Sequence, residues 1–218
     1  MIKAVIFDMD GTTVDSINSI AHFANKALKK FGFSEVPVGK FNHFVGDGPK
    51  KLFERLLDYV GGSQNEIDDI LNYYLNEYNS NVLHLSEAYH GITKMLETLK
   101  SKGIKTAIVS NKQDKAVKIL SQHFFGDLLE LNVGFKEGVA LKPAPDSLLN
   151  AMKELGVTKE ETLFVGDTDV DMITAKNAGV KSIGVLWGFR GEEELKSNGA
   201  DYIVSNAKEI FDLTQVNE

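Results

Sequence analysis

Short apolar runs recur along the chain, and each of them ends in a turn. A run of four to eight apolar residues between turn signals is typical of a strand that is buried on both faces of a parallel sheet. The pattern occurs at residues 2–8, 105–111, 131–135, 162–167, 181–187 and 201–204. Between the later runs, apolar residues return every three or four positions, as in residues 91–103, where Ile92, Met95 and Leu99 share one helical face. Strand and helix alternate from about residue 86, which predicts an α/β protein with a parallel sheet.

The segment from about residue 16 to residue 84 has no strand pattern. It contains three amphipathic helical patterns, which are separated by loop signals at residues 32–40, in "VGDGP" and in "VGGSQN". The simplest interpretation is an all-helical insert between the first strand and the rest of the sheet.

Composition and charge narrow the range of functions. The 218 residues are 43% hydrophobic and 25% charged, as in ordinary globular proteins, and the net charge of −7 argues against nucleic acid as a partner. The absence of cysteine excludes disulfides, thiolate nucleophiles and cysteine-ligated zinc. No apolar stretch approaches the roughly 20 residues that span a bilayer, and the chain enters a strand without a signal-peptide pattern. We therefore expect a cytoplasmic protein with no membrane partner; the pattern does not predict its oligomeric state.

Polar residues follow four of the predicted strands. Asp8 and Asp10 lie on the same side of their extended segment, roughly 6.5 Å apart along the chain. Asp167 and Asp171 are four residues apart at the predicted start of a helix, and therefore on one face. The other two strands lead to Ser110 with Asn111, and to the loop that carries Lys142. Because ligands bind beyond the carboxyl ends of strands in an open parallel sheet, we expect these groups to share one rim.

Several carboxylates at one rim raise each other's pKa unless a cation lies among them. A Mg²⁺ ion held by oxygen ligands would meet this need, and Lys142 adds a further positive charge. The set suits phosphoryl transfer, which requires a nucleophile, a proton donor and positive charge around the phosphoryl oxygens. One aspartate can attack phosphorus, while a second protonates the leaving oxygen and then deprotonates water.

Four segments carry a resemblance to a known family. "DMDGTTVDS", "VSNK", "KPAPD" and "VGDTDVDM" resemble, in order, the four motifs of the haloacid dehalogenase superfamily of aspartyl-phosphate phosphatases. The resemblance covers nearly the whole chain. It implies a Rossmann-like catalytic core formed by residues 1–15 and 86–218, with a helical cap domain, residues 16–85, inserted after the first strand. "FVGDGPKKLFERLL", "YHGITKMLETLKSKG" and "GVLWGFR" most resemble phosphoglycolate phosphatases.

The resemblance also implies roles for single residues. Asp8 would be the nucleophile and a Mg²⁺ ligand. Asp10 would be the acid and base, and would offer its backbone carbonyl to the metal. Ser110 would hold the phosphoryl group, Lys142 would neutralise it, and Asp167 would be a direct metal ligand.

The remaining candidates surround this set. Asp171 is expected to hold either metal-bound water or Lys142. Thr12, Asn111 and Arg55 are the predicted substrate-binding residues. For Arg55 two roles stay open: a bidentate partner of a substrate carboxylate, or a salt bridge within the cap. Trp187 and Phe189 are expected to line the cleft or to pack at the domain junction.

These residues favour a Mg²⁺-dependent phosphatase that acts on a small soluble phosphomonoester, with 2-phosphoglycolate as the first candidate. A phosphosugar mutase, or a pyrophosphatase or nucleotidase of the same superfamily, is the nearest alternative. A signalling receiver module also joins acidic residues, Mg²⁺ and a lysine, but there the insert would cover the phosphorylated aspartate. A non-catalytic binding protein would be expected to have lost Asp8, Asp10 or Lys142.

Overall fold

A six-stranded parallel sheet forms the centre of the molecule in the computed structural model, which describes residues 1–215. The strand order is β5-β4-β1-β6-β7-β8, and every neighbouring pair is parallel. The strands are β1 (Ala4–Phe7), β4 (Lys105–Gln113), β5 (Leu131–Phe135), β6 (Thr162–Gly166), β7 (Lys181–Val185) and β8 (Tyr202–Val204). All six predicted strands are therefore present, in a Rossmann-like order that confirms the predicted fold class.

Helices cover both faces of this sheet. They are α5 (Ile92–Ser101), α6 (Asp114–Phe125), α7 (Asp146–Leu155), α8 (Asp169–Ala178), α9 (Glu192–Ser197) and α10 (Ala207–Thr214). The alternating side chains of β1 show why two layers are needed. Val5 and Phe7 pack in the same core as α5, α6 and α10, while Ala4 and Ile6 pack against α7 and α8. All four side chains are fully buried, so the strand reads as an unbroken apolar run.

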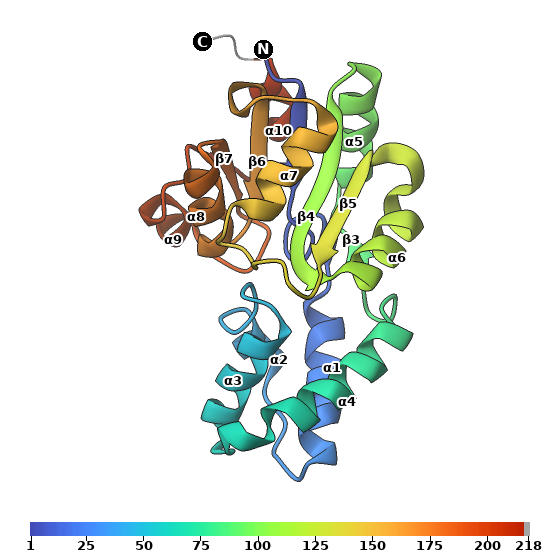
Figure 1. The fold of residues 1–218 in the computed structure, drawn as a ribbon, viewed down its shortest axis with the longest axis vertical. Coiled ribbons are helices and arrows are strands. Elements are labelled where there is room, and N and C mark those ends of the chain that lie inside the picture. The colour runs from blue at the N-terminus through green and yellow to red at the C-terminus, as the bar shows by residue number, and fades with distance from the viewer. Residues whose placement is uncertain (216–218) are drawn as a thin grey trace.

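Four helices, α1 to α4, lie beyond the carboxyl ends of the strands (Figure 1). They are α1 (Ile17–Lys30), α2 (Val38–Phe41), α3 (Pro49–Val60) and α4 (Ile67–Ser80), and we call them the helical insert. The short α2 falls partly in a segment where the sequence indicates a loop. The side chain of Asn25 hydrogen-bonds both the N–H and the carbonyl of Val36, which fixes the chain just before this helix. At the end of the helix, Phe41 is fully buried.

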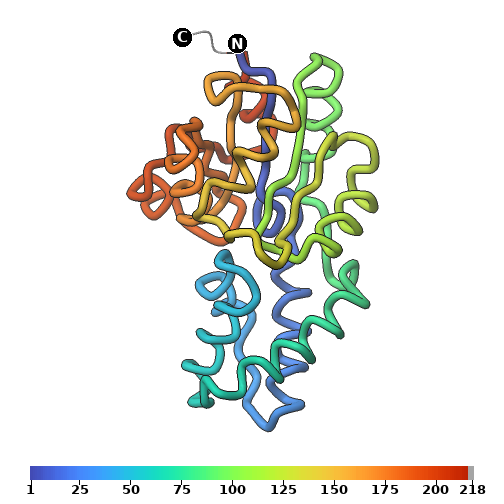
Figure 2. Tube along the Cα trace, viewed as in Figure 1, coloured from blue at the N-terminus to red at the C-terminus, as the bar shows by residue number. Residues whose placement is uncertain are grey.

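The chain passes twice between the sheet and the helical insert, as the tube trace shows (Figure 2). At these crossings β2 (Val14–Asp15) and β3 (Glu87–Ala88) pair as a two-stranded antiparallel ribbon. Short 3-10 turns occupy Gln64–Glu66, Gly126–Leu128 and Lys159–Glu161. Within residues 1–215, no helix has the length and apolar character that crossing a bilayer requires.

Candidate active site

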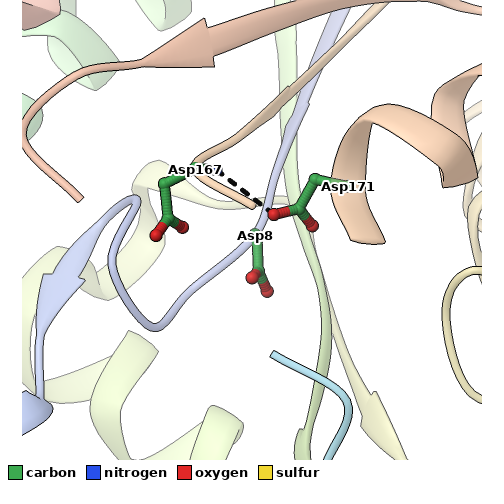
Figure 3. A group of neighbouring side chains, drawn as sticks. All are labelled: Asp8, Asp167 and Asp171. Atoms are coloured by element: carbon green, nitrogen blue, oxygen red, sulfur yellow. Dashed lines mark hydrogen bonds between the residues drawn. The ribbon is translucent and has the colours of Figure 1, made fainter. Parts of the chain in front are cut away.

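The strand order reverses between β1 and β6, and this is the place where the acidic residues meet. From β1 the chain builds the sheet outward through β4 and β5, then returns to add β6 on the other side of β1. Asp8 follows β1 and Asp167 follows β6, so the two carboxylates flank the reversal point. Ligands of open α/β sheets bind at such a point. Carboxylate oxygens of Asp8, Asp167 and Asp171 lie within 4.8 Å of one another (Figure 3).

Asp171 is fixed in place by the first turn of α8. Its Oδ2 accepts hydrogen bonds from the Thr168 hydroxyl at 2.7 Å and from the backbone N–H groups of Asp167 and Thr168 at 3.2 and 3.1 Å. The residue is fully buried. One oxygen is thus occupied by local donors, and the other, Oδ1, is left to face Lys142.

Lys142 supplies the positive charge among these carboxylates. Its Nζ lies 2.9 Å from Asp8 Oδ1 and 2.7 Å from Asp171 Oδ1. Burial opposes the charged form, but the two carboxylates outweigh it and raise the pKa of Lys142 above its ordinary value. Asn111 holds the lysine backbone at both ends: its Oδ1 accepts from Lys142 N at 2.8 Å, and its Nδ2 donates to Lys142 O at 2.9 Å.

Two carboxyl groups of the acidic cluster have raised pKa values in spite of this lysine. Burial raises the pKa of Asp8 to about 6, although the charge of Lys142 acts in the opposite direction. Burial also raises the pKa of Asp167 well above its usual range, and the neighbouring Asp171 and Asp8 add to the effect. A divalent cation would remove this electrostatic cost. Three convergent carboxylates are the hard oxygen ligands that Mg²⁺ prefers, so the donor set fits that ion.

Asp10 lines the same pocket as Asp8 and is partly exposed. Its Oδ1 accepts from the Ser16 hydroxyl at 2.5 Å. Lys112 Nζ, from the end of β4, lies 2.8 and 3.0 Å from the two carboxylate oxygens of Asp10. The acidic group is therefore held by one hydroxyl and one ammonium, with its side chain directed to a pocket that Asp8 also lines.

This pocket opens between the sheet and the helical insert. The core contributes Asp8, Asp10, Ser110, Asn111, Lys112 and Phe189. The insert contributes mainly apolar and aromatic walls, from Ile20, Val45, Leu52, Tyr74, Leu75 and Tyr78. Asn111 also joins the two sides, because its Nδ2 donates to the backbone oxygen of Gly46 at 3.0 Å. A small ligand in this pocket would contact both parts of the molecule.

Two predicted substrate-binding residues lie outside this lining. Thr12 is fully buried, and its hydroxyl donates to Asp167 Oδ1 at 2.7 Å, so it orients a carboxylate of the acidic cluster. Arg55 is engaged within the insert, where its guanidinium lies 2.6 Å from Asp47 Oδ2 and donates to Phe44 O at 2.8 Å. Of the predicted substrate-binding residues, the structure brings Asn111 alone to the pocket wall.

The loop after β7 contributes contacts that sequence reasoning did not find. The backbone N–H of Phe189 donates to Asp167 Oδ2 at 2.9 Å, and Trp187 Nε1 donates to Thr12 O at 2.9 Å. Gly188 lies so close that a Cβ there would be 2.3 Å from Asp167 Cβ. Backbone donors leave no sequence signal. Lys112 was also not selected, although it follows Ser110 by two residues and so shares the direction of that strand side chain.

The family of the chain follows from comparison with known proteins. The family model of the haloacid dehalogenase-like hydrolases matches residues 5–185, which include all of the cluster described above. The chain belongs to this family. Within the family it is phosphoglycolate phosphatase-like, and it is a phosphoric monoester hydrolase.

Several relatives match over nearly their full length. A phosphoglycolate phosphatase of Aquifex aeolicus is 32% identical, over 97% of this chain and 96% of its own. That of Colwellia psychrerythraea is 30% identical, over 96% and 95% of the two chains. A crystal structure from Lactobacillus delbrueckii subsp. bulgaricus superposes with a TM-score of 0.93 at 30% identity, and covers 97% of this chain and 98% of that one. The similarity thus includes the sheet and the helical insert together.

We predict that Gly188→Ala weakens divalent-metal binding by at least tenfold. The added methyl group would displace the Asp167 side chain, because its Cβ would also lie 2.5 Å from Asp167 Oδ2. Gly191→Ala is the matched control in the same loop, since a Cβ there meets no atom within 4 Å. The measurement is a calorimetric Mg²⁺ titration of both variants. Equal affinities in the two variants would contradict the tight approach described here.

We predict that Asp8→Asn stabilises the metal-free protein at about pH 7.5 by an amount on the order of 1 to 3 kcal/mol. The folded state raises the pKa of Asp8 from 3.8 to about 6, so it binds this proton more tightly than the unfolded chain. The Asp8 contribution to stability therefore falls as the pH rises through this interval and is constant above it. Urea unfolding at several pH values measures the difference. It should vanish below about pH 4; a destabilised variant at pH 7.5 would refute the assignment.

Proposed function

We propose that this protein is a Mg²⁺-dependent phosphatase that hydrolyses a small phosphomonoester, with 2-phosphoglycolate as the first candidate, through a phosphorylated Asp8. The observation that carries the proposal is the convergence of Asp8, Asp10 and Lys142 at one end of the sheet, beside a pocket. The names of the relatives support the choice of 2-phosphoglycolate.

In the first step, a carboxylate oxygen of Asp8 attacks phosphorus and the bond from phosphorus to the ester oxygen breaks. Asp10 donates a proton to that leaving oxygen, so an alcohol departs. Lys142 Nζ, at 2.9 Å from Asp8 Oδ1, lies where it neutralises both the nucleophile and the incoming phosphoryl oxygens. Ser110 lines the same pocket, and its hydroxyl would hold a phosphoryl oxygen.

In the second step, water attacks the phosphorus of the acyl phosphate. Asp10, now a carboxylate, takes the proton of that water, and the bond between phosphorus and Asp8 breaks to return the free carboxylate. The ammonium of Lys112 and the hydroxyl of Ser16 keep Asp10 oriented toward the pocket through both steps. One residue thus moves a proton in each direction, and the enzyme ends the cycle unchanged.

Mg²⁺ would be held by the carboxylates of Asp8 and Asp167 together with the backbone carbonyl of Asp10. Asp171 is less suited to direct contact, because Lys142, Thr168 and two backbone N–H groups occupy its oxygens. When bound, the ion supplies positive charge to the phosphoryl oxygens and to the nucleophile. Thr12 and the N–H of Phe189 would keep Asp167 in the orientation that the ion needs.

The helical insert, over residues 16–85, would act as a cap on a catalytic core formed by residues 1–15 and 86–218. The two crossings of the chain meet in the β2–β3 ribbon, so residues 13–16 and 82–88 are the natural hinges. Opening would admit water for the second step, and closure would keep bulk water from the first. Contacts such as Asn111 Nδ2 to Gly46 O would form on closure.

We predict that the protein releases phosphate from 2-phosphoglycolate in the presence of Mg²⁺ and that Asp8→Asn lowers kcat on the order of 10⁴-fold or more. The amide cannot attack phosphorus, whereas the fold retains its shape. Asp169→Asn is the matched control, since Asp169 belongs to the same "GDTDVD" segment but lies outside the acidic cluster. A phosphate-release assay over a panel of small phosphoesters decides the matter. Full activity in Asp8→Asn would exclude the proposed nucleophile.

We predict that the apparent affinity for Mg²⁺ falls as the pH drops below about 6. The ion must displace the proton from Asp8, whose pKa in the metal-free protein is about 6, and the raised pKa of Asp167 acts in the same direction. Each displaced proton costs up to tenfold in affinity per pH unit. Calorimetric titrations at about pH 5 and about pH 7.5 measure the change. An affinity independent of pH would show that these carboxylates do not bind the ion.

A further inference from the structure

Lys112 is a buried cation that links the core to the helical insert. It lies near the end of β4, and its side chain is 6% exposed. On one side its Nζ contacts both oxygens of Asp10, and on the other it donates to the Tyr78 hydroxyl at 2.5 Å. Tyr78 belongs to α4 of the insert. The phosphatase chemistry described above assigns Lys112 only the task of orienting Asp10.

The cationic residues at and near the pocket differ in how available they are to a substrate anion. Of the described residues that line it, Lys112 is the one with a positively charged side chain. Lys142 lies deeper, where it is engaged by Asp8 and Asp171. Arg55 is paired with Asp47 and lies outside the lining. An anionic group on the substrate, other than the phosphoryl group, would therefore meet Lys112.

The distance from the reacting bond agrees with such a contact. Asp10 must approach the leaving oxygen to about 3 Å in order to protonate it. Lys112 Nζ lies 2.8 Å from the same carboxylate, so it is at most about 6 Å from that oxygen. In the phosphate ester of a small 2-hydroxy acid, the carboxylate carbon is two bonds from the leaving oxygen. A substrate carboxylate is thus within reach of the ammonium.

We propose that Lys112 and the hydroxyl of Tyr78 bind a carboxylate on the leaving group, which makes the enzyme selective for phosphorylated 2-hydroxy acids over phosphoesters of uncharged alcohols. The inference rests on the proposed phosphatase function and adds the recognition of the leaving group to it. Without Lys112, a substrate carboxylate would lie near the carboxylate of Asp10 with no cationic side chain among the described residues that line the pocket.

The donors for this contact are present in the structure. An ammonium has three N–H donors, and the two contacts with Asp10 can narrow to one bond, which frees a donor for the ligand. Tyr78 accepts from Lys112, and its hydroxyl also lies beside that of Ser19. An O–H rotates about its C–O bond, so the phenol can donate to the ligand while Ser19 donates to the phenol oxygen. Burial, followed by the charge of Asp10, raises the pKa of Tyr78 well above its ordinary value, and the phenol stays protonated.

The test compares two esters that differ at one group. In 2-hydroxyethyl phosphate a hydroxymethyl group replaces the carboxylate of 2-phosphoglycolate. We expect the wild-type enzyme to prefer 2-phosphoglycolate. Lys112→Met should lower kcat for both esters, because Asp10 loses a partner that orients it. It should lower kcat/KM for 2-phosphoglycolate at least tenfold more than that for 2-hydroxyethyl phosphate, with the additional loss mainly in KM. Tyr78→Phe should shift the same ratio in the same direction by a smaller factor. Lys26→Met, which removes an exposed lysine paired with Glu77, is the matched control.

The outcomes separate this inference from the proposed function. Equal losses on both esters in Lys112→Met would overturn it, since they would mean that Lys112 acts only by orienting Asp10. Equal turnover of both esters by the wild-type enzyme would overturn it and leave the phosphatase function standing. Absence of turnover with every ester would overturn both. Should Lys112→Met fail to fold, competitive inhibition of the wild-type enzyme decides: the inference requires glycolate to bind at least tenfold tighter than ethylene glycol, and equal binding refutes it.

Discussion

The ammonium of Lys142, set between Asp8 and Asp171, is the interaction on which the rest of the site depends. Three buried carboxylates cannot share one rim of a sheet without a compensating charge. The fold supplies this charge from a loop whose backbone is fixed by Asn111, at the end of β4. The same Asn111 contacts Gly46 of the helical insert. Lys142 therefore neutralises the carboxylates, while Asn111 both fixes Lys142 and joins the sheet to the helical insert.

The single positive charge of Lys142 does not neutralise all three carboxylates, and the remaining negative charge favours the binding of a cation. Burial raises the pKa of Asp8 to about 6 and that of Asp167 well above its usual range, so the metal-free cluster opposes the ionised form of these carboxylates. Sites with strongly shifted pKa values are often functional. In this site, a divalent cation, or a phosphoryl group bound together with its metal, would lower the electrostatic cost of the ionised carboxylates. The buried carboxylates thus lower the stability of the metal-free protein and raise its affinity for the metal ion that the proposed reaction requires.

The fold was predictable from sequence because buried parallel strands have a plain signature. All six strands were found, and strand-end logic placed Asp8, Asp167 and Lys142 at one rim. Contacts that depend on docking were not predictable. Lys112 and Asp10 are 102 residues apart, and Thr12 and Asp167 are 155 apart, so no local pattern relates them. For Arg55 the sequence left two roles open. The pairing with Asp47 depends on the conformation of the loop at residues 44–48, which the sequence does not reveal. Sequence periodicity finds elements, whereas their tertiary neighbours decide which side chain faces the pocket.

The most direct test of the central claim is to trap the phosphorylated enzyme. A reaction with 2-phosphoglycolate and Mg²⁺ would be quenched in acid within the first turnover, digested, and analysed by mass spectrometry. The account predicts one phosphoryl group, on the peptide that contains Asp8, released by hydroxylamine as an acyl phosphate should be, and absent from Asp8→Asn. Phosphate release with no phosphorylated peptide at any quench time, or a phosphoryl group on another residue, would contradict the account.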